Sequence, residues 1–348
     1  MRWHWPVVSA AAVIVLLLGW WGRQPSASVG ETHFAITPEG VTARTAAGRE
    51  LWRHSFDPEW RHPLSQVSES LRVAGGHEPT VYFMTSQRDR RSDGQAEGGE
   101  FTALTMGGRP RWSFRFDDTI TVGGKPYGPP WGLTAFAIHD AAGRRHVAVA
   151  AHHWTWGPSV VAVLDDATGN RLGTYGNDGW IEQLHWLSPD RLVAGGFSQS
   201  WDGGMVALID PTRLDGRFPE KETAHLCQSC GPNLPLRVVI MPRSEINLAT
   251  RSRFNRAIVE RIADRLIVRT VEVPPLGQGV ADAIYEFSPG LELVTASYSL
   301  RYWEVHDQLF AEKKLDHDRR ACPDKDGPRQ LHIWLPDTGW TSPGVTRP

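Results

Sequence analysis

The sequence predicts an all-β protein built from repeated β-hairpins. One phrase, a strand followed by a Gly-closed turn and a second strand that ends in Trp, runs from Ala43 to Trp52 and again from Ala103 to Trp112. Looser copies occupy residues 163–172 and 333–340. Hairpins that recur along a chain indicate an array whose units bury their faces against one another. The composition agrees, because 34 Gly and 25 Pro supply turns and 16 Trp favour half-buried pleated surfaces.

Charge excludes one class of partner. The chain of 348 residues holds 37 Lys and Arg against 39 Asp and Glu. A nucleic-acid-binding protein needs a basic surface that this balance does not provide. We therefore expect no nucleic-acid partner.

The first element is a membrane segment over residues 1–23. Residues 6–21 carry no charge, and Trp residues flank them as in an interfacial belt. We expect a signal anchor, a single transmembrane helix that leaves the main domain on the extracytoplasmic, periplasmic side. A signal peptide cleaved near residues 26–28 and a buried soluble helix are the alternatives. Residues 24–31 are expected to be a linker, and residues 32–348 the β domain.

Short strand-like segments separated by Gly, Pro and Asp fill the first part of this domain. Three strand–loop–strand units match one another, over residues 80–105, 146–165 and 191–210. Their connections, residues 86–99, 152–158 and 198–204, should therefore emerge on one face of the array. The expected strands of this part are residues 33–37, 41–45, 51–56, 80–85, 100–105, 111–116, 133–138, 146–151, 160–164, 181–187, 191–196 and 205–209.

The pattern becomes less regular after about residue 225. Residues 236–241 and 265–273 are predicted strands, and residues 284–293 a hairpin. A short helix is predicted over residues 302–314, because Trp303, His306, Leu309 and Phe310 share one helical face. We expect degenerate repeat units with one inserted helix; a separate C-terminal domain is the alternative.

The repeated phrase resembles the repeat of PQQ-like, quinoprotein-type β-propellers. The resemblance implies a β-propeller of about six or seven blades, in which Gly makes a turn and Trp docks between neighbouring blades. The quinone-dependent enzymes of that family carry a vicinal disulfide and a calcium site, and this chain has neither an adjacent Cys pair nor a matching acidic cluster. No cofactor is therefore expected. The chain is also similar to uncharacterised membrane-anchored bacterial propellers. The residues that match the repeat are Gly48, Trp52, Gly108, Trp112, Gly169 and Gly339.

The three cysteines indicate a disulfide in an exported domain. Cys227 and Cys230 form a Cys-x-x-Cys motif, and the bridge lies either within it or between one of them and Cys322. A zinc site that adds Cys322 and His225, His317 or His332 is one alternative, and thiol–disulfide exchange is another. Attachment of c-type haem is excluded, because residue 231 is Gly.

Aromatic and polar residues on two of the equivalent loops form the predicted binding face. Adjacent residues of an extended segment point to opposite sides, so two neighbouring His are not expected to share a metal. The structural alternative is that these rings pack against the edge of a blade. The binding-face residues are His152, His153, Trp154, Trp156, Trp201 and Asp202.

Two further polar groups are not assigned a site. His306 and His317, with neighbouring Asp residues, suggest a hydrolytic or calcium site, but the acidic run at residues 324–327 lacks the remaining calcium ligands and is interpreted as a solvated loop. Arg residues between 243 and 256 suggest an anion site, but a loop tied by Arg–backbone hydrogen bonds explains them better. We assign no catalytic residue and no metal site.

These observations predict a membrane-anchored extracytoplasmic β-propeller that acts as a binding or assembly scaffold, with another protein as its partner at the loop face. The alternative is a propeller enzyme, an oxidoreductase or hydrolase with its site in the central channel.

Overall fold

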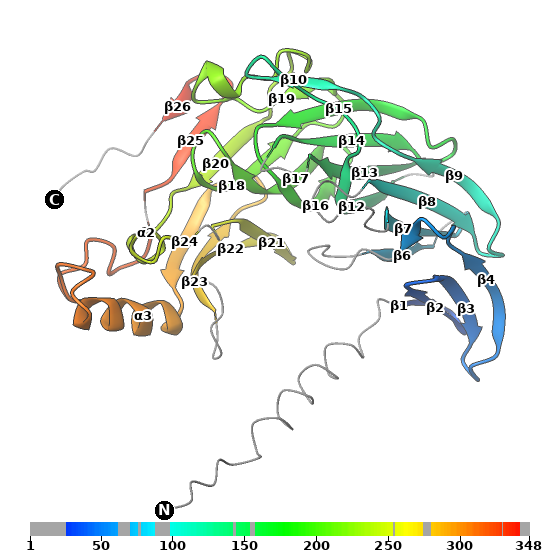
Figure 1. Cartoon of the computed structure of the whole chain (residues 1–348), viewed down its shortest axis with the longest axis horizontal. Helices are drawn as coiled ribbons and strands as arrows, with labels where there is room; N and C mark the ends of the chain where they lie inside the picture. Colours follow the sequence, from blue (N-terminus) through cyan, green and yellow to red (C-terminus); the bar gives the residue numbers. More distant parts are fainter. Residues whose placement is uncertain are drawn as a thin grey trace, which may run out of the picture.

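The computed structural model describes residues 26–61, 70–75, 78–87, 98–141, 144–153, 157–252, 255–273, 280–328 and 330–341. The predicted membrane segment, residues 1–23, lies outside these ranges. Within them the regular structure is mostly β-strand, arranged as largely antiparallel sheets with two short helices and one 3₁₀ turn (Figure 1). None of the helices in these ranges is both long enough and apolar enough to cross a bilayer.

Sheets 1 and 2 contain the two best copies of the repeated phrase. Sheet 1 is an antiparallel meander, whereas in sheet 2 both β5 and β6 pair with β7. Residues 26–29, expected as part of a linker, instead form β1, which pairs with β2 along its whole length. Sheet 1 consists of β1 (Ser26–Val29), β2 (Thr32–Thr37), β3 (Gly40–Thr45) and β4 (Glu50–Ser55), and sheet 2 of β5 (Trp60–Arg61), β6 (Leu71–Ala74), β7 (Thr80–Gln87), β8 (Gly99–Thr105) and β9 (Pro110–Phe114).

Sheet 3 follows a small hairpin and carries one parallel strand at its edge. The hairpin is β10 (Ile120–Val122) with β11 (Lys125–Tyr127). The strands of sheet 3 are β12 (Gly132–Ala141), β13 (Arg144–His152), β14 (Ser159–Asp165) and β15 (Arg171–Asn177), with β19 (Gly216–Arg217) parallel to β15.

Sheets 4 and 5 are connected by a chain path that leaves sheet 4 and later returns to it. Strands β25 and β26, from the C-terminal end of the chain, extend sheet 4 beyond β20 (Figure 1). Sheet 4 consists of β16 (Ile181–Ser188), β17 (Arg191–Ser198), β18 (Gly203–Ile209), β20 (Arg237–Met241), β25 (His332–Leu335) and β26 (Gly339–Thr341), and sheet 5 of β21 (Ala257–Ile262), β22 (Arg265–Val273), β23 (Ala281–Phe287) and β24 (Leu293–Tyr298).

Hydrophobic clusters join each sheet to the next, so that the order in space follows the order along the chain. The described residues form five sheets of four or more strands, against a predicted six or seven blades. No cluster of the described residues combines sheet 1 with sheet 5. Representative members are Phe34 and Phe83 between sheets 1 and 2, Phe101 and Phe136 between sheets 2 and 3, Ala148 and Leu184 between sheets 3 and 4, and Val206 and Val268 between sheets 4 and 5.

The repeated Trp residues lie between consecutive sheets. The indole Nε1 of Trp52 in β4 donates to the carbonyl of Met106, in the turn between β8 and β9 of sheet 2, at 2.7 Å. That of Trp112 in β9 donates to the carbonyl of Asp166 at the end of β14 at 2.6 Å. Each Trp therefore connects the last strand of one sheet to a turn of the next.

Two α-helices and a 3₁₀ turn interrupt the sheets: η1 (Thr223–His225), α2 (Glu245–Ala249) and α3 (Leu300–Ala311). Helix α3 begins two residues earlier than predicted, because the hydroxyl of Ser299 caps it by accepting from the Tyr302 N–H at 3.2 Å. Trp303, His306 and Leu309 are buried as expected. Phe310, expected on the same face, is 42 % exposed. The buried face of α3 instead includes Val305, which belongs to the same hydrophobic cluster as Trp303 and Leu309.

Candidate functional site

The strand ends that flank the connections predicted to be equivalent are linked to one another at one end of the sheets, here named the loop end. The connections join β7 to β8, β13 to β14 and β17 to β18. Trp131 links the first two, since its carbonyl accepts from Gly99 N–H at 2.7 Å and its ring lies 5.6 Å from that of His153. Trp180 links the second and third: its ring lies 4.6 Å from His152, and its carbonyl accepts from Phe197 N–H.

The two histidines of the predicted binding face contact different neighbours. His152 packs on Trp180, and burial lowers the pKa of its imidazole to about 4, so the ring is neutral. His153 packs edge-on against Tyr127, at 5.1 Å between ring centroids. Both rings therefore help to pack the edges of the sheets. Trp154 and Trp156 lie outside the described residues.

Trp201 and Asp202 occupy the connection between β17 and β18. The ring of Trp201 packs at 4.4 Å from His332 and at 4.5 Å from Trp340, and therefore helps to hold β25 and β26 on sheet 4. Asp202 has a positive φ of 47° and an exposed side chain. Of these two residues, Asp202 is the one presented to solvent.

Arg243 connects the loop end to helix α2. Its guanidinium binds the carboxylate of Asp202 at 2.7 Å, the side-chain oxygen of Asn247 at 2.5 Å and the carbonyl of Ser252 at 2.6 Å. The arginine thus ties a surface loop together through side-chain and backbone oxygens, as the sequence analysis favoured.

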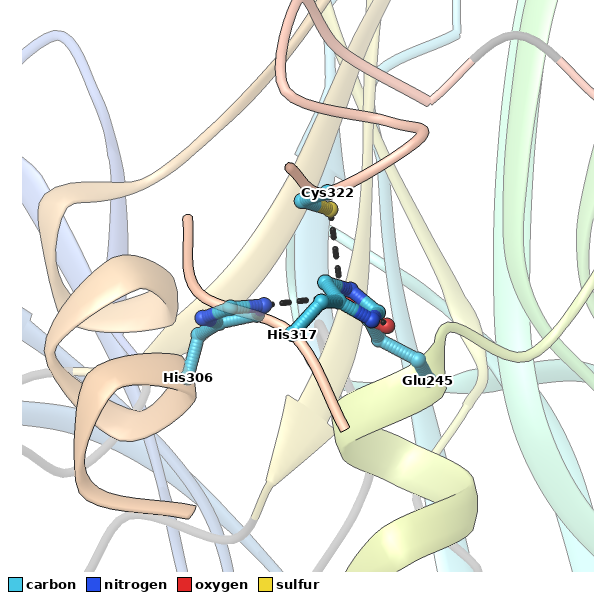
Figure 2. A group of neighbouring side chains, drawn as sticks. All are labelled: Glu245, His306, His317 and Cys322. Carbon is cyan, nitrogen blue, oxygen red and sulfur yellow. Dashed lines mark hydrogen bonds and ion pairs between the residues drawn. The ribbon is translucent and has the colours of Figure 1, made fainter. Parts of the chain in front are cut away.

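Four side chains with metal-ligating atoms converge beside α2. Glu245 is the first residue of α2, His306 lies on α3, and His317 and Cys322 lie in the turns that follow α3 (Figure 2). One ligand atom from each lies within 4.8 Å of every other. We name these four residues the EHHC cluster.

The carboxylate of Glu245 is the centre of the EHHC cluster. Its Oε1 lies 3.1 Å from Nε2 of His306, and its Oε2 lies 3.0 Å from Nε2 of His317. The thiol of Cys322 donates to Oε1 at 3.2 Å. His306 and Cys322 are buried, whereas the Glu245 and His317 side chains are about one quarter exposed, at 25 % and 22 %.

Buried hydrogen bonds hold Glu245 in place. The hydroxyl of Ser244 caps α2 and donates to the fully buried carboxylate of Glu272 at 2.7 Å. The side-chain amide of Asn247 donates to the Glu272 carbonyl at 2.8 Å. The start of α2 is therefore fixed to β22, and the position of Glu245 with it.

The protonation of the EHHC cluster argues against a cysteine nucleophile. Burial, helped by the neighbouring Glu245 carboxylate, raises the pKa of the Cys322 thiol to about 12. A reactive cysteine needs the opposite shift, because the thiolate is the nucleophile. The hydrogen bond from Nδ1 to Asp316, at 2.7 Å, raises the pKa of the His317 imidazole.

These four residues were not predicted to lie together. Cys227 and Cys230 form a disulfide with each other, which leaves Cys322 free and buried, and so excludes the zinc site built on the Cys-x-x-Cys motif. His306 was predicted on the apolar face of a helix and is completely buried there, but neither it nor His317 was predicted to lie beside Glu245. The available signals were the place of His306 on the apolar face of a predicted helix and the odd number of cysteines.

The comparisons with known proteins give likenesses to solved structures alone. No family model matches the chain, and neither does a curated protein. The hydrazine synthase of Kuenenia stuttgartiensis is 11 % identical, with a TM-score of 0.44 over 88 % of this chain and 71 % of that chain. The GH43 endo-arabinanase of Bacillus licheniformis is 13 % identical, with a TM-score of 0.34 over 78 % and 96 %. The β-propeller domain of the Trilobed protease from Pyrococcus furiosus is 11 % identical, with a TM-score of 0.34 over 66 % and 57 %.

Proposed function

We propose that this protein is a membrane-anchored, extracytoplasmic β-propeller that acts as a binding or assembly scaffold, with its loop end as the contact surface for another protein. The observation that carries the proposal is that the strand ends flanking three equivalent connections are linked to one another at one end of sheets 2, 3 and 4. Loops held by a rigid framework are the usual location of binding residues.

The disulfide supports the proposed location. Cys227 and Cys230 are bridged within one short loop. Disulfides persist in oxidising compartments and are rare in the cytosol. Together with the uncharged segment at residues 6–21, the bridge favours an anchored domain outside the cytoplasm.

Site-directed photocrosslinking in the native membrane tests the contact surface. A photoreactive residue in place of Asp202 lies at the loop end, and one in place of Asp190 lies in the β16–β17 turn at the other end of the same sheet. Both positions are exposed, so they form a matched pair. We expect a discrete protein adduct from position 202 alone. Equal adducts from both positions, or an adduct from position 190 alone, would contradict the assignment.

Membrane extraction tests the anchor. We expect the full chain to stay with the membrane after an alkaline wash, and a chain that begins at residue 24 behind a cleavable signal peptide to be released. Protease added to spheroplasts should digest the β domain of the full chain. Protection of that domain until the inner membrane is lysed would contradict the proposed orientation.

A further inference from the structure

We propose that Glu245, His306, His317 and Cys322 form a binding site for a divalent transition metal, with Zn²⁺ as the ion that their donor atoms fit best. The inference is independent of the scaffold function, because it depends on the EHHC cluster alone. Its failure would leave the loop-end proposal unchanged.

The spacing of the donor atoms suits a tetrahedral ion. Zn²⁺ binds sulfur, nitrogen and oxygen at about 2.0 to 2.3 Å, which separates neighbouring donors in a tetrahedron by about 3.5 Å. The three donor pairs that include Glu245 lie between 3.0 and 3.2 Å, and all four donors lie within 4.8 Å of one another. Small side-chain shifts would therefore place an ion between them.

The two imidazoles direct unpaired nitrogen atoms into the EHHC cluster. Nε2 of His306 and Nε2 of His317 are buried and make no hydrogen bond, although each lies within 3.1 Å of a Glu245 oxygen. Because leaving a buried polar group without a partner is unfavourable, such atoms need an explanation. A metal between the imidazoles and the carboxylate would satisfy both nitrogens.

A second carboxylate orients His317 as in known metal sites. Nδ1 of His317 donates to Asp316 at 2.7 Å, which leaves Nε2 as the ligand atom (Figure 2 shows the ring against Glu245). Metal-bound histidines usually make this second bond, because it sets the tautomer and increases the basicity of the ligand nitrogen. On the other imidazole, Nδ1 of His306 lies 3.7 Å from Asp307.

The donor set selects the class of metal. One thiolate, two imidazoles and one carboxylate suit Zn²⁺ and similar borderline ions. Mg²⁺ and Ca²⁺ prefer sites built from oxygen atoms alone. On binding, the thiol of Cys322 would release its proton to solvent and coordinate as thiolate, a change that a metal ion drives even for a weakly acidic thiol.

The ion would connect three segments that are distant in sequence. Glu245 follows sheet 4, His306 lies on the helix that follows sheet 5, and His317 and Cys322 lie on the return path to sheet 4. Ile246, Tyr302 and Cys322 already share one hydrophobic cluster with the end of sheet 5. Four protein ligands leave no open position, so the site has the form of a structural metal centre.

Metal analysis of the full chain, purified in detergent without chelator or reductant, is the first test. We expect about one zinc ion per chain, and we expect Co²⁺ added to the chelator-treated protein to give tetrahedral d–d bands and a thiolate-to-cobalt charge-transfer band. Saturating Zn²⁺ should also raise the midpoint of thermal unfolding, because an ion bound only by the folded state stabilises it. Absence of the charge-transfer band in the wild-type chain would overturn the proposal, as would displacement of Zn²⁺ by equimolar Mg²⁺ or Ca²⁺.

Variants then assign the ligands. Cys322→Ser should abolish the charge-transfer band, and His317→Gln should lower zinc affinity by at least a factor of about 100, whereas His225→Gln is the matched control outside the EHHC cluster and should bind normally. Asp316→Asn should weaken zinc binding by about 10-fold, since it acts through His317. Circular dichroism checks that each variant is folded. Normal zinc affinity in a folded His317→Gln chain would overturn the ligand set, and the wild-type cobalt spectrum decides the question if a variant does not fold.

Discussion

At the scale of single residues, the repeated Gly and Trp work as a pair. Gly108 and Gly169 have φ angles of 79° and 71°, in the left-handed region where Gly is favoured. A Cβ on Gly108 would lie 2.7 Å from the ring of Trp52, and one on Gly169 would lie 2.7 Å from that of Trp112. Gly48 has the same backbone conformation, with a φ of 83°, but open space around it. The Gly of one sheet therefore accommodates the Trp of the sheet before it.

This pairing predicts different costs for two identical substitutions. Gly48→Ala should lower the free energy of unfolding by about 1 to 2 kcal/mol, the cost of a left-handed Ala. Gly108→Ala should lower the free energy of unfolding by about 1 to 3 kcal/mol more than Gly48→Ala does, because the added methyl group also displaces Trp52. Urea denaturation of the two variants measures the difference. Equal losses would mean that Trp52 moves without cost and does not connect the sheets.

Glu220 predicts a dependence of stability on pH. Burial raises the pKa of its carboxyl group from 4.5 to about 7, and its Oε1 accepts from the N–H of Cys227 at 3.2 Å. Between these two pH values the folded state holds a proton at Glu220 that the unfolded state has lost, so this residue makes the free energy of unfolding fall as pH rises from about 4.5 to about 7. Glu220→Gln removes this contribution. The midpoint of thermal unfolding, measured from pH 4 to pH 8, should fall less with rising pH in the variant than in the wild type. Parallel curves of midpoint against pH would contradict the raised pKa of Glu220.

Residue-scale features were predictable where one local pattern determines them. Gly48, Gly108 and Trp52 belong to a short phrase whose turn geometry is local, and the structure has hairpins there with positive φ at both glycines. The partners of Cys227 were left open, since three cysteines allow more than one bridge and spacing alone does not choose among them. The structure joins Cys227 to Cys230.

At the scale of elements, the prediction depended on periodicity. Helix α3 was recognised because its apolar residues recur at helical spacing, although Phe310 was assigned to the wrong face. Strand β1 was missed, because Ser26–Val29 is only four residues long and consists of small residues that were assigned to a linker. Its pairing with β2 depends on backbone hydrogen bonds, which do not require a side-chain pattern.

The EHHC cluster was not predictable because three separate elements create it. The position of Glu245 is set by Ser244, the residue that caps α2, and the hydroxyl of Ser244 is held by the buried Glu272 of β22. His306 reaches it from α3, and Cys322 reaches it only because the chain folds back after that helix. His317 and Cys322 lie five positions apart, but Glu245 and His306 are too far from them in the sequence to complete a recognisable metal motif. Distances of this kind are decided by tertiary packing.

At the scale of the whole molecule, the sheets form a series (Figure 1). Each sheet shares a hydrophobic cluster with the next, and the helices α2 and α3 pack against the end of sheet 5. The face of sheet 5 that is turned away from sheet 4 carries ion pairs, among them Arg269 with Glu260 at 2.5 Å and Arg265 with Glu286 at 3.4 Å. The same face also carries the half-buried Ile258, Ile267 and Ile284, so it combines ion pairs with apolar side chains.

The serial arrangement predicts that damage at one interface stays local. Trp52→Ala removes the indole that connects sheets 1 and 2, so the amides of β2 and β3 should exchange with solvent at least about 10-fold faster. The amides of β22 and β23 in sheet 5 should keep their wild-type rates, because no cluster of described residues joins sheet 5 to sheet 1. Hydrogen–deuterium exchange read by mass spectrometry measures both regions at once. Faster exchange in β22 and β23 as well would show that the first and last sheets are coupled, as in a closed ring in which sheet 5 contacts sheet 1.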